Sequence, residues 1–460
     1  MQQPYSIARV LPGLVMAMLM GALDQTIMTP ALPAIAKDLG RLDQMPGVVT
    51  AYLAAATVVM PLYGKLGDRF GRKPMLLIAI VIFVTGAVLC SVATSMTQLM
   101  LFRATQGLGG GGLMVGPQAI IGEIVSPRER GRYLGVIGGA YVFAAVGGPV
   151  VGGLIVQGLG WRWIFAIYPP LAAAAFFLLL ASLRLPTPVK RPTIDYAGAV
   201  TLAAAVVGVV LLGQTRQLTW VILVVGAGTA WLITTRFAAD PILPLRLFKD
   251  LGFAIPVSIS FLIGFALFGT LTYLPAYLQV ALELPASQAG LVVTALMGGV
   301  LITTVLSGRL ITKTGRYKAY PITGTAIAAV GLALLAVTAA DSGARAIAAV
   351  IALVGLGVGL VMQVMVLAAQ NAVAYDDLGT ATSAVTFLRQ IGASAGVAVA
   401  GAVITTRLNQ QVPAAVAFSE AVPVVFGLMA PLLAVAFALA VALPNRPLRT
   451  TAYVKEMETA

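Results

Sequence analysis

Long apolar runs dominate this sequence of 460 residues and restrict what it can fold into. They continue for about 20 residues each, the length at which a helix crosses the roughly 30 Å hydrocarbon core of a bilayer. The runs are continuously apolar and do not alternate as membrane strands do. Charged residues make up only 10% of the chain, so much of this apolar surface must have lipid as its solvent. We therefore expect an all-α membrane protein.

Fourteen such runs occur, and each predicts one transmembrane helix. An even number of spans places both termini on one side, where the loops hold 21 Lys and Arg residues, against 6 in the loops of the other side. Because positively charged loops stay in the cytoplasm, we expect both termini to be cytoplasmic and the protein to be a multi-pass protein of the cytoplasmic membrane. The expected helices are 10–33, 48–66, 75–96, 98–121, 132–156, 163–183, 197–213, 219–237, 252–280, 287–310, 319–339, 346–369, 379–406 and 421–443.

The residue types that carry most metal and acid–base chemistry are scarce. There is no histidine, and the one cysteine, Cys90, lies inside an apolar run. We expect no metal site, no catalytic residue and no cofactor, so the chain is not expected to be an enzyme. No Walker A sequence is present, which makes a proton gradient the expected energy source and a carboxylate the expected proton carrier. The net charge of +13 is attributed to the loops, and no nucleic-acid partner is expected.

Parts of the chain align at an offset of 244 residues, which indicates an internal duplication. Segment 64–72 aligns with 308–316, and the glycines of 148–152 align with those of 392–396. The halves then contain helices one to six and nine to fourteen, and helices seven and eight are an inserted pair that we expect to be peripheral. The expected divisions are an N-terminal six-helix bundle (1–190), the inserted two-helix pair (191–245), a C-terminal six-helix bundle (246–445) and a cytoplasmic tail (446–460).

The same alignment shows which half carries ionisable groups. Four ionisable residues of the first half, three of them acidic, are matched by uncharged residues in the second. We infer that proton chemistry belongs to the N-terminal half. The matched pairs are Asp24 with Phe268, Asp68 with Thr312, Arg103 with Ile347 and Glu123 with Leu367.

Several motifs, in order along the chain, resemble those of one family. GKLGDRFGRKP at 64–74 resembles the loop between the second and third helices of the major facilitator superfamily. LFRATQG at 101–107 resembles its fourth-helix motif, and GGPVVGG at 147–153 resembles the fifth-helix motif of its antiporters. The segments 23–35 and 378–396 resemble the fourteen-helix drug:proton antiporter family. The resemblance implies two six-helix bundles plus an inserted pair, and proton-coupled export of small amphipathic or cationic compounds, that is, multidrug efflux.

The 64–74 motif is expected to act in gating. A plain positively charged loop would explain its basic residues but not Asp68. A carboxylate can stabilise a helix N-terminus, and the resemblance implies that this helix is the thirteenth span and that Arg72 and Glu123 join the charge network. The expected gating residues are Gly64, Asp68, Arg69, Gly71 and Arg72.

The antiporter motif consists of small residues along one span. They allow a neighbouring helix to pack closely, and simple close packing is the alternative to a role in preventing leak. The residues of this motif are Gly148, Pro149, Gly152 and Gly153.

Asp24 and Arg103 both lie inside their spans, and Asp24 is the carboxylate furthest from either loop. Counting 1.5 Å per residue puts each about 8 Å inside the outer edge of the bilayer core, so the two can meet if their helices are neighbours, as the resemblance implies. We expect proton coupling by Asp24 and Arg103, with Glu123 as a further carboxylate; a static ion pair is the alternative. Arg389 lies nearer the cytoplasmic end of its span, where it can extend to the surface.

The substrate site is expected near the bilayer midplane, between the halves of a monomer. Other open functions are export of a lipid, a siderophore or an amino-acid derivative, and, more remotely, a receptor that does not transport. For each candidate residue, packing or contact with lipid is the alternative. The candidates are Tyr52, Gln118, Phe143, Phe261, Phe265, Gln363 and Met365.

Overall fold

The computed structural model describes residues 7–40, 44–185, 193, 195–215, 217, 219–338, 343–408 and 413–452. These residues form helices joined by short connections. The longer helices are α1 (Ile7–Ile27), α3 (Met45–Phe70), α4 (Arg72–Ser91), α5 (Met96–Ile124), α6 (Pro127–Gly158), α8 (Tyr168–Ser182), α9 (Tyr196–Thr215), α10 (Thr219–Phe237), α11 (Leu251–Leu271), α13 (Ala286–Thr314), α14 (Ala319–Thr338), α15 (Ala344–Ala372), α16 (Leu378–Leu408) and α17 (Ala414–Ala442). The shorter ones are η1 (Thr29–Ala31), α2 (Leu32–Leu39), α7 (Trp163–Ala166), η3 (Leu245–Lys249), α12 (Leu274–Val280) and η4 (Tyr375–Asp377).

Thirteen helical stretches of the described chain are long and apolar enough to cross a membrane, and each corresponds to an expected run. The remaining run, 98–121, forms the 29-residue helix α5, which is long enough to span but is not among the thirteen. Four consecutive glycines at 109–112 and an internal arginine make it less apolar than the others. The protein is a multi-pass membrane protein, and the count of fourteen spans stays a prediction.

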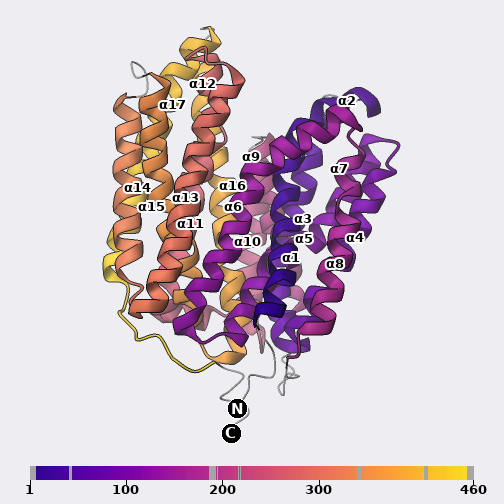
Figure 1. Cartoon of the computed structure of the whole chain (residues 1–460), viewed down its shortest axis with the longest axis vertical. Helices are drawn as coiled ribbons and strands as arrows, with labels where there is room; N and C mark the ends of the chain where they lie inside the picture. The colour runs from indigo at the N-terminus through magenta and orange to yellow at the C-terminus, as the bar shows by residue number, and fades with distance from the viewer. Residues whose placement is uncertain are drawn as a thin grey trace.

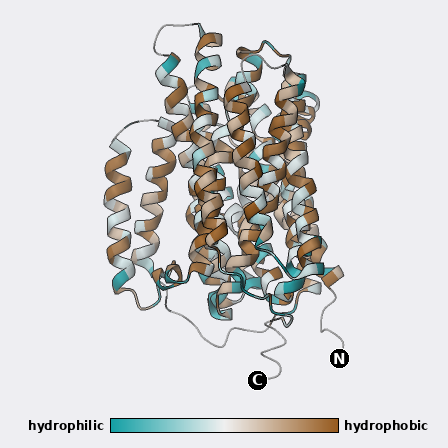
Figure 2. Ribbon diagram, turned by 90° about the vertical axis from the view of Figure 1, so that its left-hand side faces the viewer, coloured by the Kyte–Doolittle hydropathy of each residue, from teal (hydrophilic) through white to brown (hydrophobic). Residues whose placement is uncertain are grey.

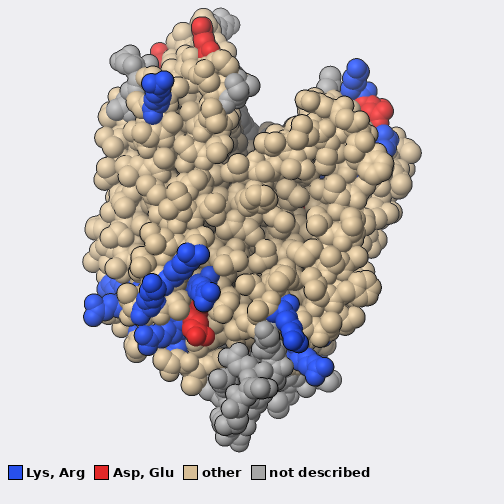
Figure 3. All heavy atoms as spheres, viewed as in Figure 1, with Lys and Arg blue, Asp and Glu red and all other residues tan. Residues whose placement is uncertain are grey.

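Two helical bundles lie side by side and diverge toward one end (Figure 1). The N-terminal bundle contains α1 to α8 and the C-terminal bundle contains α11 to α17. The described chain begins at Ile7 and ends with residues 443–452 at the end where the bundles converge, which we call the basal end. At the opposite, open end a notch separates the two halves (Figure 3). Hydrophilic residues gather at the helix ends and apolar residues along their lengths (Figure 2).

Glycines make the two basal seams between the halves. A methyl group on Gly64 of α3 would lie 2.6 Å from the carbonyl oxygen of Gly379 on α16, and one on Gly308 of α13 would lie 2.2 Å from that of Gly131 on α6. Both distances are far below van der Waals contact, so a side chain at either position would separate the halves. Since Gly64 and Gly308 are related by the 244-residue offset, the duplication accounts for two equivalent seams.

The inserted pair differs from expectation in one of its helices. Helix α10 packs mainly on α9 and is largely exposed, as expected of a peripheral helix. Helix α9 packs against both α3 and α16 instead, and its Val210 and Gly213 line the central cavity, so the expectation that it is peripheral is wrong. The expected division at 190/191 lies outside the described residues.

Residues 443–452 form a strap across the basal end. On the C-terminal half, Tyr317 donates a hydrogen bond to the Pro444 carbonyl (3.2 Å), and Arg446 forms a two-point ion pair with Asp250 (2.8 and 2.9 Å). On the N-terminal half, the backbone N–H at position 128 donates to the carbonyl of Arg449 (3.1 Å). The strap therefore connects both halves at the end where they meet (Figure 1).

Candidate functional site

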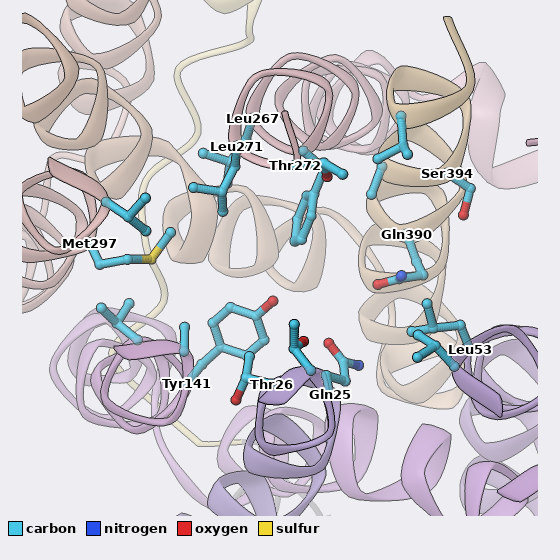
Figure 4. Close-up of a pocket in the computed structure, with 18 of the residues that line it drawn as sticks. Gln25, Thr26, Leu53, Tyr141, Leu267, Leu271, Thr272, Met297, Gln390 and Ser394 are labelled. Atoms are coloured by element: carbon cyan, nitrogen blue, oxygen red, sulfur yellow. The ribbon is translucent and has the colours of Figure 1, made fainter. Parts of the chain in front are cut away.

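A cavity of about 560 Å³ lies between the two halves. Apolar side chains dominate its wall, and no described residue that lines it is charged. In Figure 4, side chains of α1, α3 and α6 face those of α11, α13 and α16 across an empty space. The lining residues are Gln25, Thr26, Thr29, Val49, Leu53, Tyr141, Val142, Ala145, Val210, Gly213, Leu267, Phe268, Leu271, Thr272, Tyr273, Val293, Met297, Val300, Met362, Gln390, Ala393, Ser394 and Val397.

The polar groups of the cavity come from both halves. Thr26 donates to the Ala144 carbonyl of α6 (2.9 Å), which fixes the wall between α1 and α6. Gln25 has a buried Nε2 atom with no hydrogen-bond partner. Tyr141 points its hydroxyl into the cavity, and Gln390 extends toward the cavity from the other half (Figure 4). The cavity is thus an apolar container with a few convergent polar groups, the usual form of a small-molecule site.

Directly behind this wall, Asp24 forms a buried ion pair with Arg103. The guanidinium Nη1 donates to both carboxylate oxygens (2.9 and 2.7 Å) and to Gln106 Oε1 (2.8 Å). Gln106 Nε2 in turn donates to Asp24 (2.9 Å), so the amide orients both charges. Asp24 and Arg103 are each only 1% exposed. The depth count that placed them at one level agrees with this contact.

Aromatic rings cover the cation of this pair. The Tyr52 ring lies 4.4 Å from the Arg103 guanidinium carbon and the Phe165 ring 5.9 Å. The pair is therefore shielded from water in this conformation, although Gln25, the next residue along the chain, lines the cavity. A proton on Asp24 would remove the charge that holds Arg103.

A second charge cluster, Asp68–Arg72–Glu123–Tyr375, holds the halves together at the basal end. Asp68 of α3 accepts hydrogen bonds from the backbone N–H groups of Gly379 and Thr380 (2.9 Å each), which begin α16, the thirteenth expected span. A carboxylate at this helix N-terminus satisfies free N–H groups and opposes the positive end of the helix dipole. Asp68 also accepts from Arg72 (2.6 Å), one turn along.

The rest of this cluster extends across three further elements. Arg72 donates to Glu123 of α5 (2.7 Å), and Glu123 accepts from the Tyr375 hydroxyl of η4. The expected proton-coupling set is therefore not one site: Asp24 and Arg103 are together, and Glu123 belongs to the basal cluster. Of the other expected gating residues, Gly71 has φ +94° and allows the tight turn between α3 and α4, and Arg69 lies over the Phe70 ring.

The antiporter motif packs against α1 through two of its four residues. A methyl group on Gly148 would lie 2.0 Å from Thr26 Oγ1, and one on Gly152 would lie 2.5 Å from the Ile27 carbonyl. Gly153 has open space beside it and Pro149 is exposed. Helix α1, which carries both Asp24 and part of the cavity wall, is thus held in place by this glycine pair.

None of the seven expected substrate residues lines the cavity in this structure. Tyr52 covers Arg103, and Phe143 is 67% exposed on the outer surface. The rings of Phe261 and Phe265 lie beside each other in a tilted arrangement, with centroids 6.2 Å apart. Gln118, Gln363 and Met365 are buried among helices.

The cavity residues Gln25, Tyr141 and Gln390 were not predicted. The sequence signal that could have indicated them is a polar side chain within an apolar span, and Gln25 also follows Asp24 directly.

The chain matches the model of the Major Facilitator Superfamily over residues 14–397 and 260–458. It is 38% identical over 429 residues to an uncharacterized MFS-type transporter of Mycobacterium tuberculosis. The alignment covers 90% of this chain but only 62% of that protein. It is 34% identical over 409 residues to the multidrug transporter protein MdtP of Bacillus subtilis, covering 86% of this chain and 75% of that one.

Two solved structures share the fold. The human organic anion transporter MFSD10 matches with a TM-score of 0.71 and 16% identity, over 95% of this chain and 100% of that one. The proton:xylose symporter XylE matches with a TM-score of 0.68 and 16% identity, over 98% of each chain.

Proposed function

We propose that the chain, which belongs to the major facilitator superfamily, is a transporter and not an enzyme, namely a proton-coupled antiporter that exports small amphipathic compounds, as in multidrug efflux. One observation carries the proposal. The Asp24–Arg103 pair is a deeply buried ion pair of the N-terminal half, and it lies directly behind the wall of the cavity between the halves. Ionisable groups inside a membrane are costly and are found mainly where ions or substrates move.

The proposed cycle exchanges a proton at Asp24 for a compound in the cavity. In the conformation described above, the basal seams are closed and the halves diverge at the open end, where a compound would leave. A proton that then reaches Asp24 neutralises it and frees Arg103, which loosens α1 against α5. The basal cluster of Asp68, Arg72 and Glu123 opens and re-forms as the cavity changes sides. The glycine pair of α6 keeps α1 closely packed and limits proton leak.

We further propose that the basal end is cytoplasmic, which places both termini in the cytoplasm of a cell with this protein in its cytoplasmic membrane. Many of the exposed Lys and Arg residues in Figure 3 lie at that end, as expected from the distribution of positive charge in membrane proteins. The proposed topology has fourteen spans in a monomer. The partners are the small-molecule substrate, protons and lipid, with the proton gradient in place of a cofactor.

Transport by the purified protein tests this function. Proteoliposomes with an imposed pH gradient should accumulate an exported amphiphile, and a protonophore should abolish the accumulation. Competition by lipids, siderophores and amino-acid derivatives would separate multidrug efflux from the narrower exporters. Accumulation that ignores the pH gradient, or a protein that binds compounds but never moves them, would defeat the proposal.

A further inference from the structure

The cavity offers hydrogen-bond donors but no negative charge. No described lining residue is acidic, and the Asp24 carboxylate is turned away into its pair with Arg103. Gln25 lines the wall with a buried Nε2 that has no partner. A cationic compound would find no counter-charge here, whereas an acceptor group would satisfy a donor that is otherwise unpaired.

A second unsatisfied donor, Arg389, lies beside the cavity and is not itself one of its lining residues. Arg389 is 11 residues into α16, about 16 Å along the helix at 1.5 Å per residue. One turn further along the same face, Ala393 lines the cavity, as does the adjacent Gln390. The Arg389 guanidinium lies within electrostatic reach of Tyr141, which lines the cavity from the other half.

No described residue neutralises this arginine. Its Nη1 is buried and has no hydrogen-bond partner, and no carboxylate of the described chain forms an ion pair with it. The side chain as a whole is half-buried, and its extension to the cytoplasmic surface stays a prediction. An uncompensated charge at this depth is costly and points to a bound group that supplies the opposite charge. The planar guanidinium matches a carboxylate or a similar anion with two parallel hydrogen bonds.

We propose that the cavity binds amphipathic compounds whose polar group is an anion, such as a carboxylate, held by Arg389 and Gln25. The apolar wall formed by residues such as Leu267, Leu271 and Met297 holds the rest of the compound. This inference rests on the proposed export function and narrows its substrate class, which was expected to include cations. A cation is disfavoured because it would approach Arg389 without any carboxylate in the wall.

Equilibrium binding of three matched probes tests the inference. Pyrenebutanoate, pyrenebutanol and a pyrenebutyl trimethylammonium salt share one ring system and differ in charge. Their Kd values are measured by fluorescence with the full chain in nanodiscs, with empty nanodiscs as the blank for lipid partitioning. The carboxylate should bind the unmodified protein at least roughly tenfold more tightly than the ammonium, as expected for a charge-assisted pair.

Arg389→Gln should raise the carboxylate Kd roughly tenfold and change that of the neutral probe less than roughly threefold. Arg407→Gln is the matched control, because it removes a half-exposed arginine of the same helix. Gln25→Leu is a second variant, for use if Arg389→Gln does not fold, and it should also raise the Kd of the carboxylate probe. The inference is overturned if the ammonium binds as tightly as the carboxylate, if no probe saturates, or if both variants leave the carboxylate Kd unchanged.

Because this binding needs no gradient, the two proposals can fail separately. If the protein shows no preference for the anionic probe, the proposal of proton-driven transport is unaffected. If the protein shows no proton-driven transport, the measured preference for the anionic probe is unaffected.

Discussion

Asp68→Asn is expected to open the basal end while leaving the cavity intact. Asp68 accepts from the Gly379 and Thr380 N–H groups at 2.9 Å and from Arg72 at 2.6 Å. An amide keeps one acceptor oxygen, so one helix N–H loses its partner and the other loses a charged acceptor. Hydrogen bonds to charged groups contribute about 1.5–3 kcal/mol, against about 0.5–1.5 for neutral ones, so the closed base should lose about 2–3 kcal/mol. That loss shifts the conformational equilibrium roughly 30- to 150-fold toward an open base.

A reporter thiol at the other basal seam measures this shift. The native Cys90 is buried, and Ser307 of α13 is 1% exposed, so Ser307→Cys should react slowly with a maleimide until the base opens. Asp68→Asn should raise the labelling rate of this thiol without changing the Kd of a cavity ligand. Asp38→Asn is the control, because it breaks an exposed ion pair with Arg162 at the open end. Unchanged labelling, or loss of ligand affinity with normal exchange rates, would refute the gating role.

Three further changes test separate contacts. Gly148→Ala should lower the unfolding free energy by about 1–3 kcal/mol, because the new methyl overlaps Thr26, whereas Gly153→Ala should be neutral in the same thermal melt. Arg446→Ala removes the half-exposed ion pair of the strap, and its stability cost in detergent should stay below about 1 kcal/mol; a larger cost would contradict the small contribution expected of a half-exposed pair. In the Ser307→Cys protein, Gly308→Val should increase maleimide labelling of the new thiol, because the seam with Gly131 cannot close. Labelling at the rate of the Ser307→Cys protein alone would contradict the close contact of Gly308 with Gly131.

The depth of residues along the chain could be predicted, and their orientation around each helix could not. Apolar runs locate the helices, and counting residues puts Asp24 and Arg103 at one level, where they are in contact. A helix that is apolar on every side gives no signal for the face that lines a cavity, because lipid and protein interior favour the same side chains. Phe143 faces outward and Tyr141, two residues earlier, lines the cavity for this reason.

Long-range contacts needed a different kind of information. The contact of Asp68 with the thirteenth span was implied by the resemblance of its motif, not by its spacing. The packing of α9 against both α3 and α16 left no mark in its composition, since a lipid-facing helix and a cavity-facing helix are both apolar. Arg389 could be noticed as a charge in a span, but its lack of a partner required the packed structure.

The central claim is that Asp24 carries the coupled proton, and Asp24→Asn in proteoliposomes tests it most directly. Removing one partner of a buried ion pair costs about 3–5 kcal/mol, so correct folding of the variant must be verified, and Asp24→Glu serves as the control that keeps the acid. We expect Asp24→Asn to retain exchange of substrate for substrate and to lose accumulation driven by a pH gradient, while Asp24→Glu retains both. Accumulation at the unmodified rate in well-folded Asp24→Asn protein would contradict the account and would transfer the role to Glu123.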